Sequence, residues 1–351
     1  MIFCGDIAIP TKEVGEKFIQ SVKATGIFKD EVVIGNLEGP LCGEHKGYPQ
    51  YKLFNDDVIV GFKEICEKFI VSLANNHTYD YPNTIARTKE LLVSNGIAYF
   101  GMIEEDSVNP LQFKCGGKIY AIFGHCWDLY TKTNPNRLTR DRVVDCSYED
   151  LFHTVSMYAK NHPEERALLF PHWNFDFEEL PFPAYIELAH DLIDAGVWAV
   201  LGNHTHCVQP FEVYHGHLIC YSLGNFCIPD GYFFNGRLKY PEDSKKCYVV
   251  NVPEEGDMVT LYEVKTDDNG EGINVLSKKE IALGEDDLLT DRQEVASKGG
   301  YGNYFKSFRS KKRLTPVFNS YKKTVFNRIK KEFLICKVRS IRSVISMISD
   351  K

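Results

Sequence analysis

Short runs rich in Val, Ile, Phe and Tyr alternate along most of the chain with segments whose apolar residues recur every three or four positions. The first pattern is typical of buried strands and the second of amphipathic helices. The expected strands are 2–4, 31–37, 69–74, 97–100, 118–123, 167–171, 197–201 and 218–222. The expected helices are 12–24, 58–68, 84–95 behind an Asn83 cap, 148–161 behind a Ser147 cap, and 184–195. This alternation predicts a layered α/β fold with some parallel strands.

The pattern changes in the last third of the chain. Residues 247–283 read as consecutive strands, which predicts an antiparallel meander that closes the fold. We therefore expect one α/β domain over residues 1–285 and an extension over residues 286–351. In the extension, apolar residues at helical spacing predict an amphipathic helix with a stripe formed by Phe326, Ile329, Phe333, Leu334, Val338, Ile341, Ile345 and Ile348.

The extension is also strongly basic. Residues 298–351 hold fifteen Lys or Arg against two acids, a net charge of +13, which leaves 26 bases against 46 acids and a net charge of -20 for the rest. Basic termini are often no more than solvated tails, but an apolar stripe beside bases is typical of a helix that lies on an anionic membrane surface. Docking on the acidic body is the alternative. We do not expect nucleic acid as the partner.

Composition narrows the class of protein. The chain has 351 residues, 44% of them hydrophobic and 25% charged, which is typical of a globular protein with a sizeable core. Its eleven cysteines are scattered and form no C-x-x-C pair, so neither a disulfide framework nor a zinc finger is expected. The sequence has no apolar run long enough to span a membrane, and no basic leader segment. We expect a cytoplasmic protein with reduced thiols.

Five short segments place metal-binding side chains directly after expected strands. They are Gly5-Asp6, residues 35–40 with Asn36 and Glu38, residues 73–77 with Asn75, Asn76 and His77, residues 171–173 with His172 and Trp173, and residues 202–206 with Asn203, His204 and His206. A single histidine is more often structural than ligating, but strand ends in an α/β sheet meet at one rim. Carboxylate, amide and imidazole groups together favour Mn²⁺, Fe²⁺ or Zn²⁺ over Mg²⁺ or Ca²⁺.

The segments GDIAI, VVIGNLEGP, FIVSLANNHTYDY, LLFPHWNFDFEELPFP and AVLGNHTHCVQPFEVYHGHLICYSLGNF carry a resemblance that covers about residues 1–253. Through them the chain resembles the bacterial capsule-synthesis CapA family, within the calcineurin-like metallophosphoesterase superfamily. The resemblance implies a metallophosphoesterase-like layered α/β sandwich, here with a basic helical C-terminal extension. It also implies a role in capsule or extracellular polymer biosynthesis, with poly-γ-glutamate as the family's namesake polymer.

The resemblance further implies one or two divalent transition-metal ions. The implied ligands are Asp6, Glu38, Asn76, His172, His204 and His206, with Asp6 and His206 on the first ion, Asn76, His172 and His204 on the second, and Glu38 between them. His77 matches a histidine that protonates a leaving group or steadies a phosphoryl oxygen. Residues expected to orient the ligands or contact substrate are Asn36, Asn75, Asp80, His125, Trp173, Asp176, Glu178 and Asn225. Each of these also has a structural reading, as a turn residue or, for Trp173, as packing.

Three departures from the family pattern affect the expected site. Ala8 stands where the superfamily's D-x-H motif has a histidine, which leaves the first ion short of a ligand. Asn174 and Asp176 replace the glycine and glutamate of H-W-G-x-E, and the fifth segment has Asn203 and Thr205 in place of the second and fourth residues of G-H-H-P-H. These later changes keep the ligand atoms in place.

The expected activity is hydrolysis of a phosphoester by an activated water, with His77 as general acid. The expected substrate is an anionic phosphoester or capsular polymer, handled in the cytoplasm at the inner face of the membrane. Two alternatives stay open at this point. One is a non-catalytic polymer-binding component of capsule assembly or export, and the other is a hydrolase of γ-glutamyl amides.

Overall fold

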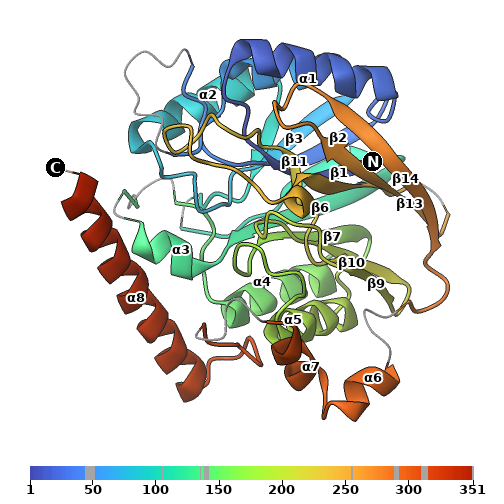
Figure 1. Ribbon diagram of the computed structural model, residues 1–351. Helices are drawn as coiled ribbons and strands as arrows, with labels where there is room; N and C mark the ends of the chain where they lie inside the picture. Colours follow the sequence, from blue (N-terminus) through green and yellow to red (C-terminus); the bar gives the residue numbers. More distant parts are fainter. Residues whose placement is uncertain are drawn as a thin grey trace.

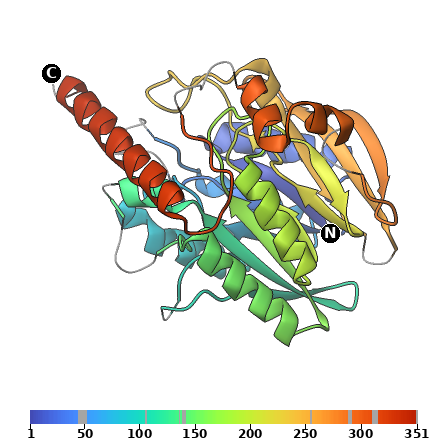
Figure 2. The same ribbon diagram turned by 90° about the horizontal axis from the view of Figure 1, so that it is seen from below.

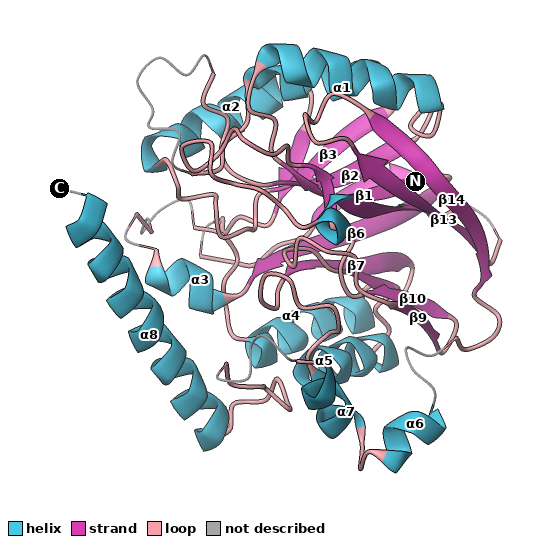
Figure 3. Cartoon of the chain, viewed as in Figure 1, coloured by secondary structure: helices cyan, strands magenta, loops and turns pink. Residues whose placement is uncertain are grey.

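Two β-sheets lie face to face at the centre of the molecule, with helices on both outer sides (Figure 1, Figure 3). The computed structural model describes residues 1–43, 52–104, 106–134, 136–137, 142–253, 256–287, 292–309 and 315–349, with side chains up to Ser340 in the last segment. The larger sheet has the order β14-β13-β12-β1-β2-β3-β4, with β11 also paired to β1, and the smaller sheet has the order β5-β6-β7-β8-β10-β9.

The parallel strands of both sheets direct their carboxyl ends to one region. The larger sheet contains β1 (Ile2–Ile7), β2 (Val32–Leu37), β3 (Lys68–Ser72), β4 (Ala98–Phe100), β11 (Asn225–Cys227), β12 (Lys246–Asn251), β13 (Met258–Thr266) and β14 (Ile273–Ala282). The smaller contains β5 (Leu111–Cys115), β6 (Lys118–Cys126), β7 (Glu165–His172), β8 (Ala199–Leu201), β9 (Phe211–Tyr214) and β10 (His217–Cys220). The run β1-β2-β3-β4 is parallel, as is β6-β7-β8-β10. Strands β1 and β2 are buried along their whole length, as expected for parallel strands covered on both faces.

The helices complete four layers. Helices α1 (Lys12–Thr25) and α2 (Ile85–Ser94) cover the outer face of the larger sheet, and α4 (Tyr148–Asn161) and α5 (Pro183–Asp194) cover that of the smaller sheet (Figure 1). Phe3 of β1 and Phe170 of β7 pack between the two sheets, with ring centroids 6.2 Å apart. A short helix, α3 (Asp128–Thr133), follows β6.

The layered α/β sandwich predicted from the sequence is confirmed, and so is the antiparallel meander, which is β12-β13-β14. The helix expected over residues 58–68 is wrong. That segment is a 3₁₀ helix over Asp57–Glu64, and Lys68 already begins β3. Its two buried residues, Ile59 and Phe62, are three positions apart, which matches the three-residue turn of a 3₁₀ helix.

The extension packs on the smaller sheet's side of the molecule. It contains α6 (Arg292–Ser297), α7 (Tyr301–Phe308) and the long helix α8 (Val325–Ser349). Phe305, Phe318, Tyr321, Leu334 and Ile335 belong to the same apolar cluster as α4 and α5. The division at residue 285 stays a prediction. All eleven cysteines, each within the described residues, are free thiols.

Candidate metal centre

The side chains singled out at the strand ends come together where the two sheets meet. Asp6 lies in β1 and Glu38 directly follows β2, whereas His172 ends β7 and His204 and His206 follow β8. All five are buried, with at most 5% of their surface exposed. Two groups of side chains in the described chain match the expected ion sites, Asp6-Glu38-His206 and Glu38-His172-His204, and both contain Glu38.

The first group is Asp6, Glu38 and His206. His206 places Nε2 3.9 Å from Oε1 of Glu38 and Nδ1 3.8 Å from Oδ2 of Asp6. Asn225 pairs with Asp6 in the β1–β11 register, and its Oδ1 lies 2.9 Å from His206 Nδ1. When Nδ1 donates to this amide oxygen, Nε2 keeps its lone pair for an ion. Ala8 is fully buried in a separate apolar cluster and supplies no ligand atom.

The second group is tighter and has four members. His172 Nε2 lies 2.7 Å from Asn76 Oδ1, 3.0 Å from His204 Nδ1 and 3.7 Å from Glu38 Oε1. These four atoms are two imidazole nitrogens, an amide oxygen and a carboxylate oxygen. Each has a lone pair to offer, and their mixture is typical of a site for Mn²⁺, Fe²⁺ or Zn²⁺.

Glu38 tests whether an ion fits here. Its side chain is fully buried, and neither carboxylate oxygen has a hydrogen-bond partner in the described structure. A buried, unpaired carboxylate is strongly unfavourable. Burial raises the pKa of Glu38 well above its usual range, and the nearby Asp6 carboxylate acts in the same direction. A divalent cation beside the carboxylates of Glu38 and Asp6 would compensate their negative charge, so the residues fit a metal centre.

Buried amides fix the carboxylate of Asp6. Asn36 Nδ2 donates to Asp6 Oδ1 at 2.8 Å, and Asn75 Nδ2 donates to Asn36 Oδ1 at 3.2 Å and to the Leu37 carbonyl at 2.7 Å. Asn75 Oδ1 in turn accepts from the backbone N–H of His77 at 3.1 Å. The pair therefore links β1, β2 and the loop after β3 into one rigid rim.

His77 stands at the edge of the centre and is 16% exposed. Its Nδ1 lies 2.6 Å from Oδ2 of Asp80, and its Nε2 lies 3.8 Å from Oε1 of Glu38. Asp80 thus holds one ring nitrogen and directs the other toward the ligands. This arrangement is suited to transfer of a proton at Nε2.

The loop after β7 closes another side of the centre. Asp176 Oδ1 lies 3.3 Å from His204 Nε2, and its side chain is 54% exposed. Asn174 and Phe177 adopt left-handed backbone conformations, with φ of 75° and 59°. The N–H of Phe177 donates to the Thr205 carbonyl at 2.8 Å, which joins this loop to the turn after β8. Asp176 is therefore placed to orient His204 through its second ring nitrogen.

The turn after β8 is backbone-strained. His204 and His206 both have positive φ, at 93° and 56°, a region that residues other than glycine seldom occupy. Gly202 is required beside them, because a Cβ there would lie 2.1 Å from the Tyr221 carbonyl oxygen and 2.5 Å from Trp173 Nε1. Strain of this kind persists where surrounding structure holds it, often at functional sites.

Within the described chain, three of the residues expected to orient ligands or contact substrate bond to residues outside the ligand groups. His125 is buried, and its Nε2 lies 2.9 Å from the Cys146 carbonyl oxygen. Trp173 donates from Nε1 to the Tyr221 carbonyl and stacks on Tyr185 with centroids 4.8 Å apart, so it packs beside the site. Glu178 pairs with Arg309 of the extension.

Sequence reasoning missed two aromatic residues and Arg309. The Tyr130 ring of α3 lies 4.5 Å from the His204 ring, and the Tyr240 ring lies 5.1 Å from that of His206. Tyr130 also donates from its hydroxyl to the Asn174 carbonyl at 2.8 Å. No spacing in the sequence marks these residues, since tyrosines are frequent throughout the chain.

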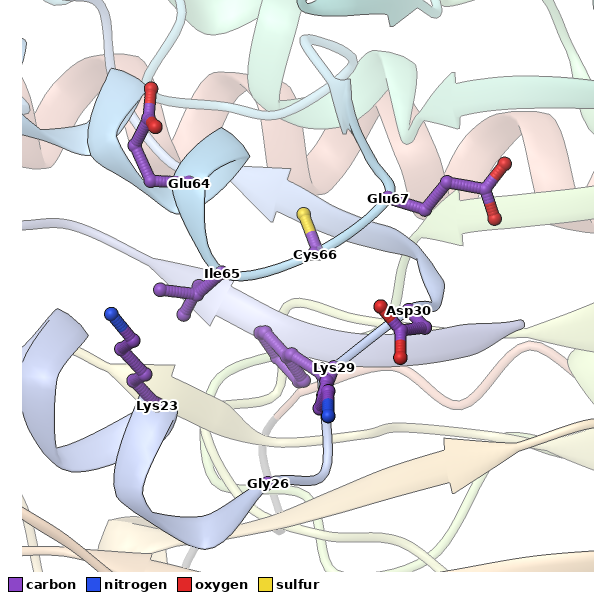
Figure 4. A pocket seen from close by; sticks show the side chains of 9 residues that line it. Lys23, Gly26, Lys29, Asp30, Glu64, Ile65, Cys66 and Glu67 are labelled. Carbon is purple, nitrogen blue, oxygen red and sulfur yellow. The ribbon is translucent and has the colours of Figure 1, made fainter.

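A pocket elsewhere does not compete for this role. It has a volume of about 640 Å³ and is lined by residues such as Lys23, Asp30, Glu64 and Cys66 (Figure 4). Asp30 precedes β2 and Cys66 precedes β3, so the pocket lies at the amino ends of these strands, opposite the ligand groups. Lysines and acids both line this pocket, and it contains no group of metal-binding side chains among those of the described chain. The carboxyl ends of the strands therefore remain the candidate site.

Two curated proteins are similar to this chain over part of its length. The chain is 29% identical over 224 residues to "Capsule biosynthesis protein CapA" of Bacillus anthracis, covering 58% of this chain and 51% of that protein. It is 27% identical over 250 residues to "PGA biosynthesis protein CapA" of Bacillus subtilis (strain 168), covering 66% and 63%. The chain therefore spans between half and two thirds of the length of these relatives.

Among solved structures, the calcineurin-like phosphoesterase YfkN from Bacillus subtilis aligns with a TM-score of 0.43 and 11% identity, covering 84% of this chain and 93% of that one. Residues 1–230, which include every ligand of the candidate centre, match the family described as bacterial capsule synthesis protein PGA_cap. The chain belongs to this bacterial capsule synthesis family.

Proposed function

We propose that this protein is a metal-dependent hydrolase, of phosphoesterase type, that acts in the biosynthesis of a capsule or other extracellular polymer. The observation that carries the proposal is the buried carboxylate of Glu38. It is shared by two ligand groups, and Nε2 of His77 faces it at 3.8 Å. A site that only binds a polymer has no need of a proton donor beside its ligands.

Two ions would be held unequally. Glu38, Asn76, His172 and His204 would hold one ion with four ligands, whereas Asp6, Glu38 and His206 would hold the other with three. A bound divalent ion lowers the pKa of a water molecule and neutralises phosphoryl oxygens. The amides of Asn36 and Asn75 keep the Asp6 carboxylate in position for this role.

The protein's own contribution to bond cleavage is a proton. His77 donates it from Nε2 to the leaving oxygen, while Asp80 at 2.6 Å from Nδ1 stabilises the charged imidazole before transfer. The substrate class follows from charge. A centre that can hold two divalent ions attracts an anion, either a phosphoester or an anionic capsular polymer, as the capsule and PGA biosynthesis names of the two Bacillus relatives suggest.

The test is metal analysis of purified protein made with Mn²⁺, Fe²⁺ or Zn²⁺, followed by assay on phosphomonoesters, phosphodiesters and γ-glutamyl peptides. We expect bound metal and hydrolysis of a phosphoester, both strongly reduced in Glu38→Gln. Glu242→Gln is the matched control, because Glu242 is 64% exposed and forms ion pairs with Lys245 and Lys265 rather than with a candidate ligand. Metal at background level would refute the centre. Bound metal with no hydrolysis would favour a polymer-binding component, and cleavage of γ-glutamyl peptides alone would favour an amide hydrolase.

A further inference from the structure

Helix α8 docks on the body through one narrow face. Leu334 and Ile335 are 3% and 5% exposed and join the apolar cluster of α4 and α5. Lys331 pairs with the buried Asp128 of α3, and Arg339 Nη2 donates to the Lys132 carbonyl at 3.4 Å. The C-terminal end of α8 projects away from the body (Figure 2).

A second apolar face of α8 is left uncovered. Val325, Phe326, Ile329 and Phe333 are 73%, 77%, 61% and 56% exposed. At 3.6 residues per turn these four positions form one stripe, on the side of the helix opposite Leu334 and Ile335. The sequence pattern merged Leu334 with this stripe, which was wrong, because Leu334 packs against the body. The side chains of Ile341, Ile345 and Ile348 lie outside the described residues.

Bases border the uncovered stripe on both sides. Helical geometry places Lys337 along one border and Arg328 and Arg339 along the other, and all three are exposed. Glu332 is the one acidic residue of the helix and shares a border of the stripe with Arg328 and Arg339. Lys322 and Lys323 precede the helix and pair with acids of the body, Glu187 and Asp150. An apolar stripe with Lys337 on one border and Arg328 and Arg339 on the other matches the two chemistries of an anionic lipid surface, acyl chains and charged headgroups.

We propose that this face of α8 binds an anionic lipid surface and lies parallel to it. Among the described residues, no helix is both long enough and apolar enough to cross a bilayer. A second copy of the chain packed on this stripe would bring the bases of the two helices together. The body, with its net charge of -20, would be kept from the lipid by repulsion, so the extension alone makes the contact.

The test compares the full chain with two triple variants on vesicles. Phe326→Ser, Ile329→Ser and Phe333→Ser remove the stripe, whereas Val93→Ser, Met258→Ser and Leu276→Ser remove exposed apolar side chains of the body, which are 64%, 44% and 49% exposed. Each protein is sedimented with phosphatidylcholine vesicles, with and without phosphatidylglycerol. Circular dichroism checks that each variant is folded.

We expect the wild type and the body variant to sediment with anionic vesicles only. The sedimented fraction should fall as added salt shortens the Debye length, which is about 10 Å at 0.1 M. The stripe variant should partition about tenfold or more weakly, since each large apolar side chain withdrawn from the interface has an effect of this size. Equal binding to neutral vesicles, or full binding by the stripe variant, would overturn the proposal. A third result would also overturn it: the wild type forms a dimer in sedimentation velocity and does not bind vesicles, and the stripe variant is a monomer. The partner of the stripe would then be a second copy of the chain.

Discussion

Arg309 in the extension and Glu178 beside the metal centre form an ion pair in which both side chains are at least nine-tenths buried. Arg309 Nε donates to Glu178 Oε1 at 3.0 Å and its Nη1 donates to the Thr315 carbonyl at 2.9 Å. Its guanidinium lies 5.2 Å from the Phe182 ring centroid. Glu178 belongs to the same loop as Asp176, which faces His204. The extension therefore supports the loop that orients a candidate ligand.

Removing Arg309 should destabilise the fold markedly. Arg309→Met leaves Glu178 buried without its partner, for which about 3 to 5 kcal/mol of unfolding free energy is typical. Lys323→Met is the control, because Lys323 and its partner Asp150 are each 57% exposed and such a pair contributes about 0 to 1 kcal/mol. Urea denaturation measures both. Equal losses in the two variants would contradict the special role of the buried pair.

The Glu38→Gln variant should bind less metal than the wild type. Without metal, however, the variant should be more stable than the wild type at high pH. Burial raises the folded-state pKa of Glu38, so the stability from its protonated form is present below the ordinary glutamate pKa of 4.5 and is lost as pH rises through the folded-state pKa. Glutamine stays neutral and shows no such loss. The difference in Tm between variant and wild type in EDTA should therefore grow as pH rises. A constant difference would mean that Glu38 is not buried as a charge.

His77→Ala should retain metal and lose turnover of a phosphoester by about 10² to 10⁴, the usual contribution of general acid-base catalysis. Asp80→Asn should lose less, because it perturbs only the orientation and charge of the ring. Steady-state kinetics with metal content measured on the same samples gives both numbers. Full activity in His77→Ala would remove His77 from the mechanism.

His172→Ala and His206→Ala should differ in metal content. His172 belongs to the group with four ligand atoms, and His206 to the group in which Ala8 supplies none. We expect His172→Ala to abolish the tighter binding step in a Mn²⁺ or Zn²⁺ titration, and His206→Ala to remove only the weaker one. Loss of the tighter step in His206→Ala alone would reverse the assignment.

Strong local signals were sufficient to predict much of the sandwich. The buried parallel strands are continuous apolar runs, and Ser147 caps α4 with its hydroxyl, as its position before the helix indicates. Strands β5, β9 and β11 were missed. They have three to five residues each, and β5 and β9 lie at sheet edges where part of each strand is exposed. Short edge strands carry little periodicity, and their pairing depends on partners distant in sequence.

The candidate centre was predictable for a different reason. Its ligands lie at or just after the carboxyl ends of strands, so a local signal places Glu38 and His172 at the same rim even though 134 positions separate them in the sequence. Tyr130 contacts His204 from α3, and Arg309 pairs with Glu178 because the extension docks on the body. Neither contact leaves a mark on the neighbouring residues in the sequence. The same limit explains Leu334, because helical periodicity does not reveal which of two apolar faces the body will cover.

The ligand set is divided between the two sheets, with Asp6, Glu38 and Asn76 on the larger and His172, His204 and His206 on the smaller. An ion bound by ligands from both sheets would cross-link the two layers of the sandwich. The gap that it must span is fixed by side chains deep between the layers, such as Phe3 against Phe170. Substitutions between the sheets, although far from the ion, would increase or decrease the distance between the two sets of ligands. The choice of metal is thus open to adjustment from the core as well as from the ligands.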